Sequence, residues 1–422
     1  MSQILVIIMA LLLTLAPLQW QLPLVNFQDE SRQSWNEILL LLLTVQSIFY
    51  GVVFVQRKKI LSPFFVQLSG VLSGWLIVLY LWQLPLSPNP QEFFRLLLVV
   101  WTLPLLHYLV VTLTTRGAVL ILMSLLLLHS FWGIGQFILQ HDLGLHLIGE
   151  TQLSPHLPGV AKFQSSAGTN IPPSPPKLIR AYGPYPHANS LAGSLAAAFL
   201  VGVVALKRYQ HPVLIIGLPL LFLGLLTTFS RAAGASVLST IVIMSFLFWQ
   251  DRETKLWDSW LKLCLIYLLT IMVFTPLLVD RMIDVQDQAV GERLAGLQSA
   301  HALLREHPWR GLGLGNYTDA LHHHFATHNY AYQPWEIVPI HSVPVLLLAE
   351  WGLLGVIMLI SILVWYLRRI PRYYIWYLLP LLPLLVFDHY FFTQAAPLLW
   401  LGLALLLLHR LEYSTLPVRV KQ

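Results

Sequence analysis

The sequence predicts an all-α membrane protein that crosses the bilayer many times. Of its 422 residues, 57% are hydrophobic and only 10% are charged, whereas soluble domains average about 25% charged residues. Long apolar runs recur along nearly the whole chain, and runs of roughly 18 or more apolar residues are typical of membrane-spanning helices. Residues 39–43 and 125–128 are unbroken apolar blocks, unlike the alternating segments of a transmembrane barrel.

About twelve transmembrane helices are expected from these runs. The last two runs are short for a bilayer, and the eleventh contains Pro380 and Pro383, which disfavour a continuous helix. The predicted spans cover residues 4–18, 38–55, 64–82, 96–112, 117–139, 190–206, 212–229, 232–249, 261–279, 342–367, 374–387 and 397–408.

Basic residues set the expected orientation. The formal net charge is +6, but the basic residues stand one to three at a time between apolar runs, so they indicate membrane topology and not a nucleic-acid partner. With both termini in the cytoplasm, 15 of the 25 basic residues fall on the inner side, as the positive-inside rule requires. We therefore expect a multi-pass protein of the cytoplasmic membrane, surrounded by membrane lipids.

Two long loops on the outer face divide the chain into five segments. The first loop ends in the proline-rich stretch IPPSPPKLIRAYGPYPHANS, in which prolines favour extended backbone. The predicted segments are N-terminal helices at 1–139, a proline-rich loop at 140–188, central helices at 189–279, a large loop at 280–341, and C-terminal helices with a cytoplasmic tail at 342–422.

The second loop is expected to contain a short helix followed by a tight turn. Leu294, Leu297, His301 and Leu304 recur at helical spacing, and the pair at 307–308, His-Pro, ends the pattern. The alternating glycines that follow, at 311, 313 and 315, lack the strand and helix of a dinucleotide-binding unit. They favour a close-packed turn over a nucleotide site.

No metal or other cofactor is expected. The cluster of His322, His323, His324 and His328 places two histidines four residues apart, a spacing that can bind a metal on a helix. It lacks the glutamate of a zinc-protease motif, so a solvated, loosely ordered loop is favoured. The single cysteine, Cys264, excludes an intrachain disulfide and a cysteine metal site.

Three arginines near the outer face are candidates for binding an anionic substrate. Arg231, in TTFSRAAGAS, lies between two apolar runs that leave almost no loop, and an ionisable residue there is a functional candidate unless it merely snorkels to the surface. Arg180 and Arg293 lie on the same side. Each alone fits an ordinary surface charge, but guanidinium groups around one cavity would bind phosphate oxygens in bidentate fashion.

His341 is the candidate general base. It opens the tenth predicted span on the side of the arginines, and histidine accepts protons near neutral pH. Its alternative interpretation is an interfacial histidine satisfied by water. Glu350 lies roughly two and a half turns deeper and is expected to face the bundle interior. Asp388 and His389 could add polar groups, although a helix end explains them equally well.

Four stretches resemble the bacterial O-antigen ligase and polymerase superfamily. They are GPYPHANSLAG, TTFSRAAGAS, HPWRGLGLGNY and IHSVPVLLLAEWGLLG, and they cover about residues 180–355. The family commonly has asparagine after the histidine, where this chain has Ser342. The resemblance implies that Arg231 and Arg293 bind the donor and that His341 is catalytic.

The resemblance also implies a reaction. A glycan would pass from a polyprenyl-pyrophosphate carrier to a hydroxyl of a glycan, lipid-glycan or protein acceptor, outside the cytoplasmic membrane and without a metal or nucleotide. An O-antigen-type polymerase and a protein O-glycosyltransferase remain alternatives. Twelve spans also suit a flippase or a secondary transporter, which often has related halves with helices broken at the midplane. The two halves of this sequence look unlike each other, which favours the enzyme.

Overall fold

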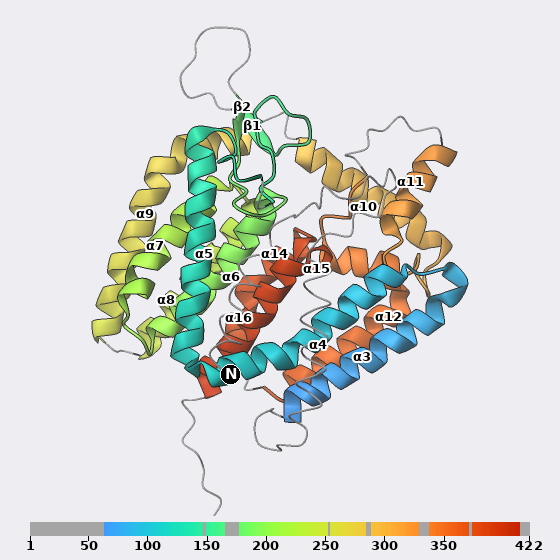
Figure 1. The fold of residues 1–422 in the computed structure, drawn as a ribbon, viewed down its shortest axis with the longest axis horizontal. Helices are drawn as coiled ribbons and strands as arrows, with labels where there is room; N and C mark the ends of the chain where they lie inside the picture. The colour runs from blue at the N-terminus through green and yellow to red at the C-terminus, as the bar shows by residue number, and fades with distance from the viewer. Residues whose placement is uncertain are drawn as a thin grey trace, which may run out of the picture.

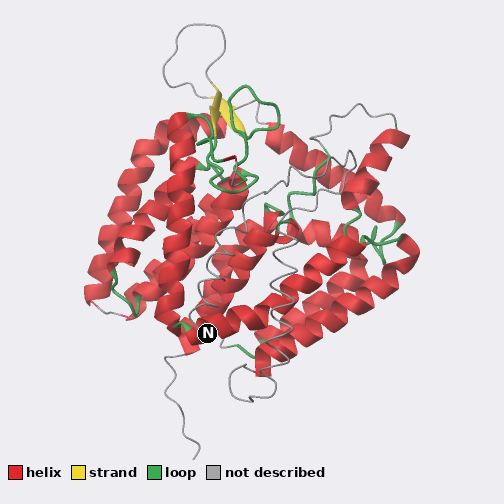
Figure 2. Ribbon diagram, viewed as in Figure 1, coloured by secondary structure: helices red, strands yellow, loops and turns green. Residues whose placement is uncertain are grey.

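The protein is mostly helical, as the sequence predicts (Figure 2). A computed structural model describes residues 63–146, 149–164, 177–251, 254–283, 288–328, 337–370 and 374–413. Within these ranges one small antiparallel sheet joins β1 (Lys162–Gln164) to β2 (Lys177–Ile179), with Phe163 opposite Leu178.

The remaining elements are helices. In chain order they are α3 (Pro63–Gln83), η1 (Leu84–Leu86), α4 (Pro90–Thr112), α5 (Thr114–Leu139), α6 (Ala188–Leu206), α7 (Pro212–Thr227), α8 (Arg231–Asp251), α9 (Thr254–Ile283), α10 (Gln288–Glu306), α11 (Tyr317–Thr327), α12 (Val343–Leu367), α13 (Ile375–Leu378), η5 (Leu379–Leu381), α14 (Leu382–Val386), α15 (Tyr390–Thr393) and α16 (Ala395–Tyr413).

Six of the described segments are long and apolar enough to cross a membrane. They are Gln67–Leu86, Thr114–Leu139, Ala188–Leu206, Arg231–Asp251, Leu256–Met282 and Val343–Leu367. Shorter apolar helices cover Pro212–Thr227, Ile375–Val386 and Ala396–Leu411. The predicted count of twelve spans is thus not confirmed, and the predicted spans at 4–18 and 38–55 lie outside the described residues.

The eleventh predicted span, residues 374–387, is not one continuous helix. It is broken into α13, η5 and α14. Pro380 lies in the 3₁₀ turn and Pro383 is the second residue of α14. The prolines interrupt the helix because each lacks a backbone N–H and its ring clashes with the preceding turn. This break brings the chain to Asp388, His389 and the short helix α15 beside the bundle.

Figure 1 shows how the helices are grouped. Helices α5 to α9 form one side of the molecule, α3, α4 and α12 form the other, and α14, α15 and α16 lie between them. At one end of the bundle α5 and α9 end, and α6, α8 and α12 begin. We call this the loop end, because the chain leaves the bundle there for the sheet and for α10 and α11.

Helix α6 forms the centre of the larger hydrophobic core. Nearly all of its residues are buried, and its many small side chains let other helices approach closely. A Cβ on Gly193 would lie 2.5 Å from Cε2 of Phe391 in α15. The tight contact fixes α15, and the residues just before it, against the start of α6.

The glycine turn packs directly against a kink in α12, which confirms the predicted close-packed turn. Gly311 and Gly352 both have positive φ angles, 71° and 67°. A Cβ on Gly352 would lie 2.4 Å from the carbonyl oxygen of Trp309, and one on Gly311 would lie 2.5 Å from that of Glu350. Gln83 closes the contact by donating to the carbonyls of Arg310 and Glu350, each at 2.7 Å.

Replacing Gly352 with alanine should therefore destabilise the fold. Gly352 has a φ of 67° and a ψ of 178°, a conformation that is almost restricted to glycine and costs other residues roughly 1–3 kcal/mol. The new methyl group would also meet backbone atoms that cannot rotate away. Gly70→Ala in α3 is the matched control, since a Cβ there has no neighbour within 4 Å. Thermal unfolding of the purified variants in detergent measures the effect, and equal melting temperatures would contradict the packing described above.

Candidate functional site

A histidine–aspartate pair lies at the loop end, where α12 begins. Nδ1 of His341 is 3.6 Å from Oδ1 of Asp388, an ion-pair distance that is longer than an ordinary hydrogen bond. Asp388 is 5% exposed and its Oδ1 also accepts the backbone N–H of His389 at 2.9 Å. The carboxylate is therefore held in place behind the imidazole.

The broken span and helix α15 position this pair. Residues 387–389 link α14 to α15, and the side chain of His389 contacts Oγ1 of Thr393 at 2.7 Å. Arg95 of α4 donates to the carbonyl oxygen of Phe392 at 2.8 Å, so α15 is tied to α4 as well as to α6. Three helices thereby fix Asp388 relative to His341.

A second group of buried polar residues adjoins the pair. The ring of His187 stacks on that of Tyr390 with 4.7 Å between centroids, and the ring of Tyr390 lies 6.3 Å from that of His341. His187 is the N-cap residue of α6, where its Nδ1 accepts the backbone N–H of Asn189. The site is thus continuous from α12 through α15 to α6.

Arg180 is buried and donates two hydrogen bonds within this part of the protein. Its Nε donates to the carbonyl oxygen of Thr228 at 2.5 Å, and its Nη2 donates to Oδ1 of Asn189. Burial and the nearby charge of Arg281 lower the pKa of Arg180 to about 10, so it stays charged at neutral pH. Arg180 therefore adds a buried positive charge near the start of α6, and it holds the turn between α7 and α8 in place through Thr228.

Shifted pKa values fix the charges of Asp388, His389 and His187 at neutral pH. Burial would raise the pKa of Asp388, but the interaction with His341 and the neighbouring imidazoles outweighs it and brings the pKa below its usual value. Burial lowers the pKa of His389 and of His187 to about 3. At neutral pH Asp388 is therefore a carboxylate, whereas His187 and His389 are uncharged.

His341 also lines a pocket between α10, α11 and the start of α12. The pocket has a volume of about 270 Å³ and includes Arg293 of α10. Gly291 and Gly296 form part of its wall, and a Cβ on either would meet nothing within 4 Å. The other lining residues are Ala295, Ser299, Leu321, Phe325, Val338, Pro339 and Ile340. Two of the four predicted site residues thus share one pocket.

Arg231 is the exposed first residue of α8 and does not line that pocket. It follows Thr228, the residue whose carbonyl holds Arg180, by three positions. The N-termini of α6, α8 and α12 all lie at the loop end, and helix N-termini favour anions through their unpaired N–H groups and the helix dipole. Arg231 adds a guanidinium to one of these N-termini.

Two groups of described residues have the composition of a metal site. In the first, Asp142, His146 and Glu150 lie together, but Oε1 of Glu150 accepts three hydrogen bonds and Oε2 accepts one, which identifies a structural role. The second is His341, Asp388 and His389 itself. In this second set, Oδ1 of Asp388 accepts the backbone N–H of His389, and Nδ1 of His389 contacts Oγ1 of Thr393.

The histidine cluster at 322–328 differs from the prediction in its structure. Residues 317–327 form helix α11 and not a loosely ordered loop. The rings of His324 and His328 have centroids 4.3 Å apart, and Nδ1 of His328 contacts the carbonyl oxygen of His324. Local contacts of this kind account for the pair.

The pairing of Asp388 with His341 is the feature of the site that the sequence does not predict. A charged residue directly after an apolar run is a functional candidate inside a membrane protein, and this signal was present. Its partner, however, lies 47 positions earlier in the chain, at His341. Only the fold of α14 and α15 brings the two side chains together.

The fold and the site define a class of protein, a polytopic helical membrane protein with a polar site at one end of its bundle. A family model described as O-antigen ligase matches residues 216–360, about a third of the chain. The matched segment is thus similar to O-antigen ligases. The match includes Arg231, Arg293 and His341, whereas Arg180 and Asp388 lie outside it. No curated protein matches the chain in sequence.

Proposed function

We propose that this protein transfers a glycan from a polyprenyl-pyrophosphate carrier to an acceptor hydroxyl, with His341 as the general base. The observation that carries the proposal is the pocket that His341 shares with Arg293, with Asp388 behind the imidazole. Such an arrangement provides a base and a phosphate-binding cation within one cavity. The family match supports the reaction class.

The arginines stabilise the leaving group. The pyrophosphate gains negative charge as the glycosidic bond breaks, and preorganised cations in a water-poor site stabilise developing charge better than water does. Arg293 lines the pocket, and Arg231 begins α8 at the same end of the bundle. Each guanidinium can bind two phosphate oxygens at once, while Arg180 acts as a positioning residue through Thr228 and Asn189.

His341 activates the acceptor. Its Nδ1 faces Asp388, which leaves Nε2 to take the proton from the acceptor hydroxyl. The acceptor oxygen forms a bond to the anomeric carbon, and the bond from that carbon to the phosphate oxygen breaks with its electron pair. The proton then resides on His341, and the Asp388 carboxylate stabilises the imidazolium.

The product's stereochemistry tests this reaction. A single displacement inverts the anomeric configuration relative to the donor, whereas a covalent glycosyl-enzyme intermediate would retain it. Purified protein is incubated with a lipid-linked glycan of known configuration and with separate lipid-glycan, glycan and protein acceptors. NMR of the anomeric proton should show inversion in the product of the accepted partner. Retention in that product would contradict the proposal.

The site is placed on the outer face of the cytoplasmic membrane, with both termini inside. The basic residues of the sequence support this orientation. Thr327 is exposed at the end of α11. In the variant Thr327→Cys, the new thiol should react with a membrane-impermeant reagent in cells whose outer membrane has been made permeable and whose cytoplasmic membrane is intact. The parent for this experiment is Cys264→Ser, and protection of Thr327→Cys until the membrane is opened would place the site inside.

A further inference from the structure

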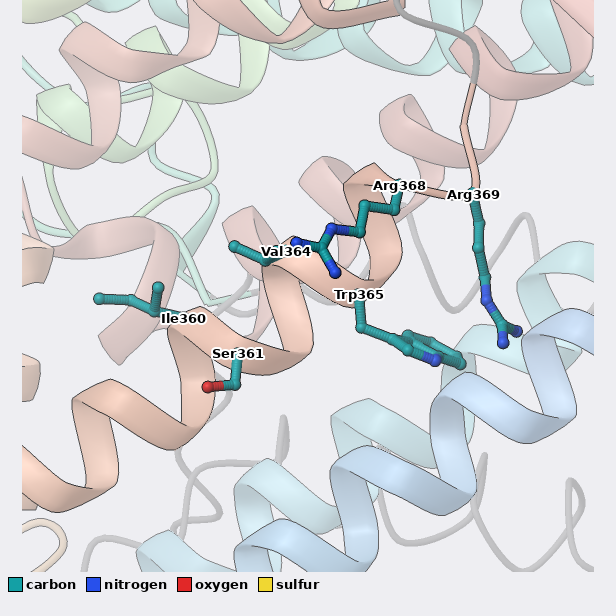
Figure 3. Close-up of a pocket in the computed structure, with 6 residues that line it drawn as sticks. All are labelled: Ile360, Ser361, Val364, Trp365, Arg368 and Arg369. Carbon is teal, nitrogen blue, oxygen red and sulfur yellow. The ribbon is translucent and has the colours of Figure 1, made fainter.

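A second cavity lies at the opposite end of α12 from His341. It has a volume of about 450 Å³ and is lined by Ile360, Ser361, Val364, Trp365, Arg368 and Arg369. In Figure 3 these side chains form two adjoining rows on α12, one of Ile360, Val364 and Arg368 and one of Ser361, Trp365 and Arg369. The two arginines come just after the helix ends. The cavity is therefore mostly apolar along α12 and carries two positive charges at the end of that helix.

The arginine end matches an anionic head group at a membrane surface. Arg368 and Arg369 are exposed, and the guanidinium carbon of Arg369 lies 4.1 Å from the ring centroid of Trp365. Tryptophan is enriched at the boundary between lipid and water, and α12 is a candidate membrane span that ends at Leu367. The pair of guanidinium groups is therefore placed at the level of lipid phosphates.

A neighbouring cavity continues this one toward the middle of α12, and we call the two together the groove. The neighbouring cavity has a volume of about 350 Å³ and shares Ser361 with the first. Its walls are residues of α12 and α3, namely Val71, Gly74, Trp75, Val78, Met358, Ser361 and Ile362. A Cβ on Gly74 would meet nothing within 4 Å, so the missing side chain keeps the groove open.

The length of the groove fits one acyl chain. From Met358 to Arg369 the chain advances eleven residues, or about 16 Å at about 1.5 Å per residue in a helix. One leaflet of a bilayer has a hydrocarbon thickness of about 15 Å, half of the whole. The groove thus extends from the head-group level to about the bilayer centre.

We propose that this groove binds an anionic phospholipid. The phosphodiester contacts Arg368 and Arg369, which guanidinium chemistry favours, and one acyl chain lies along α12 over Gly74. Charge complementarity identifies the occupant, because a zwitterionic lipid would bring its own cation to the two arginines. The site is distinct from the pocket of His341, and it does not depend on the reaction proposed above.

The test is lipid binding to the purified full-length protein. Native mass spectrometry in detergent would count phosphatidylglycerol molecules retained per protein during titration, with phosphatidylcholine of the same acyl chains as the comparison lipid. The expected result is one phosphatidylglycerol bound at least tenfold more tightly than phosphatidylcholine. The double variant Arg368→Gln/Arg369→Gln should abolish that preference.

Two pairs of variants separate a defined site from general lipid contact. Gly74→Leu should fill the groove and weaken phosphatidylglycerol binding, whereas Gly234→Leu, at an equally open position in α8, should not. Arg116→Gln removes an exposed basic residue at the same end of the bundle, at the start of α5, and should leave the preference intact.

Equal effects of the groove and control variants would overturn the proposal, as would equal binding of the two phospholipids. A third arm adds a polyprenyl phosphate as competitor. Displacement of phosphatidylglycerol by an equal concentration of polyprenyl phosphate would assign the groove to a carrier lipid instead. Melting temperatures of the lipid-free variants, expected to match the wild type, show that each variant is folded.

Discussion

Replacing His341 with alanine should lower the rate of glycan transfer by about 10²- to 10⁴-fold, the usual contribution of a positioned general base. Binding of the lipid-linked donor should change little, because the base acts on the acceptor. His341→Gln should fail equally, since glutamine can form a hydrogen bond but cannot take a proton. The measurement is single-turnover transfer in nanodiscs, with donor affinity measured on the same samples.

His323→Ala is the control for this experiment, because His323 is an exposed histidine on α11. It should transfer glycan at the wild-type rate. A His341→Ala variant that lost donor binding and transfer in equal proportion would identify His341 as a substrate contact. Wild-type transfer by the same variant would remove His341 from the mechanism.

Replacing Arg293 with lysine should weaken donor binding by roughly ten- to a hundredfold. Lysine keeps the charge but loses the planar fork that binds two phosphate oxygens, and a charge-assisted hydrogen bond contributes about 1.5–3 kcal/mol. Arg305→Lys on the same helix is the matched control, because Arg305 is exposed and does not line the pocket. Titration with the lipid-linked donor measures both.

Arg231→Lys distinguishes the two interpretations of Arg231. A phosphate-binding role predicts a loss similar to that of Arg293→Lys, measured at matched protein abundance. A snorkelling anchor at the start of α8 predicts no loss, because lysine reaches the membrane surface equally well. In the second case the pyrophosphate would be bound by Arg293 together with the helix N-termini.

Local patterns in the sequence were sufficient for several elements. The repeat of Leu294, Leu297, His301 and Leu304 predicted a helix, and α10 ends at Glu306, just before the His-Pro pair. The alternating glycines predicted a close-packed turn, and Gly311 indeed contacts the kink at Gly352. Both features depend on backbone chemistry within a few residues, which a single sequence reveals.

Other elements depend on contacts between distant parts of the chain. Helix α11 lies in a polar stretch rich in histidine, where the apolar pattern is weak, yet Tyr317 and Leu321 bury one face against the core of α10 and α12. Asp388 meets His341 only because two prolines break the preceding segment. No local spacing in the sequence predicts either contact.

Arg180 shows the same limit for a predicted site residue. Its sequence position beside the outer face suggested a substrate contact, but its donors reach Thr228 and Asn189 within the protein. Residue type and side of the membrane thus predicted that the arginine would lie near the site. Its partners are set by how the turn between α7 and α8 packs over the start of α6.

The central claim is that this protein performs chemistry on a lipid-linked glycan and does not merely move it. Transfer in detergent micelles tests it most directly, because micelles have no second compartment and a flippase would give no signal. Purified wild-type protein should convert a donor and a matching acceptor into a covalent product, and His341→Gln should bind the donor without forming that product. An intact donor with every acceptor class, together with donor movement across liposomes by both proteins, would contradict the account.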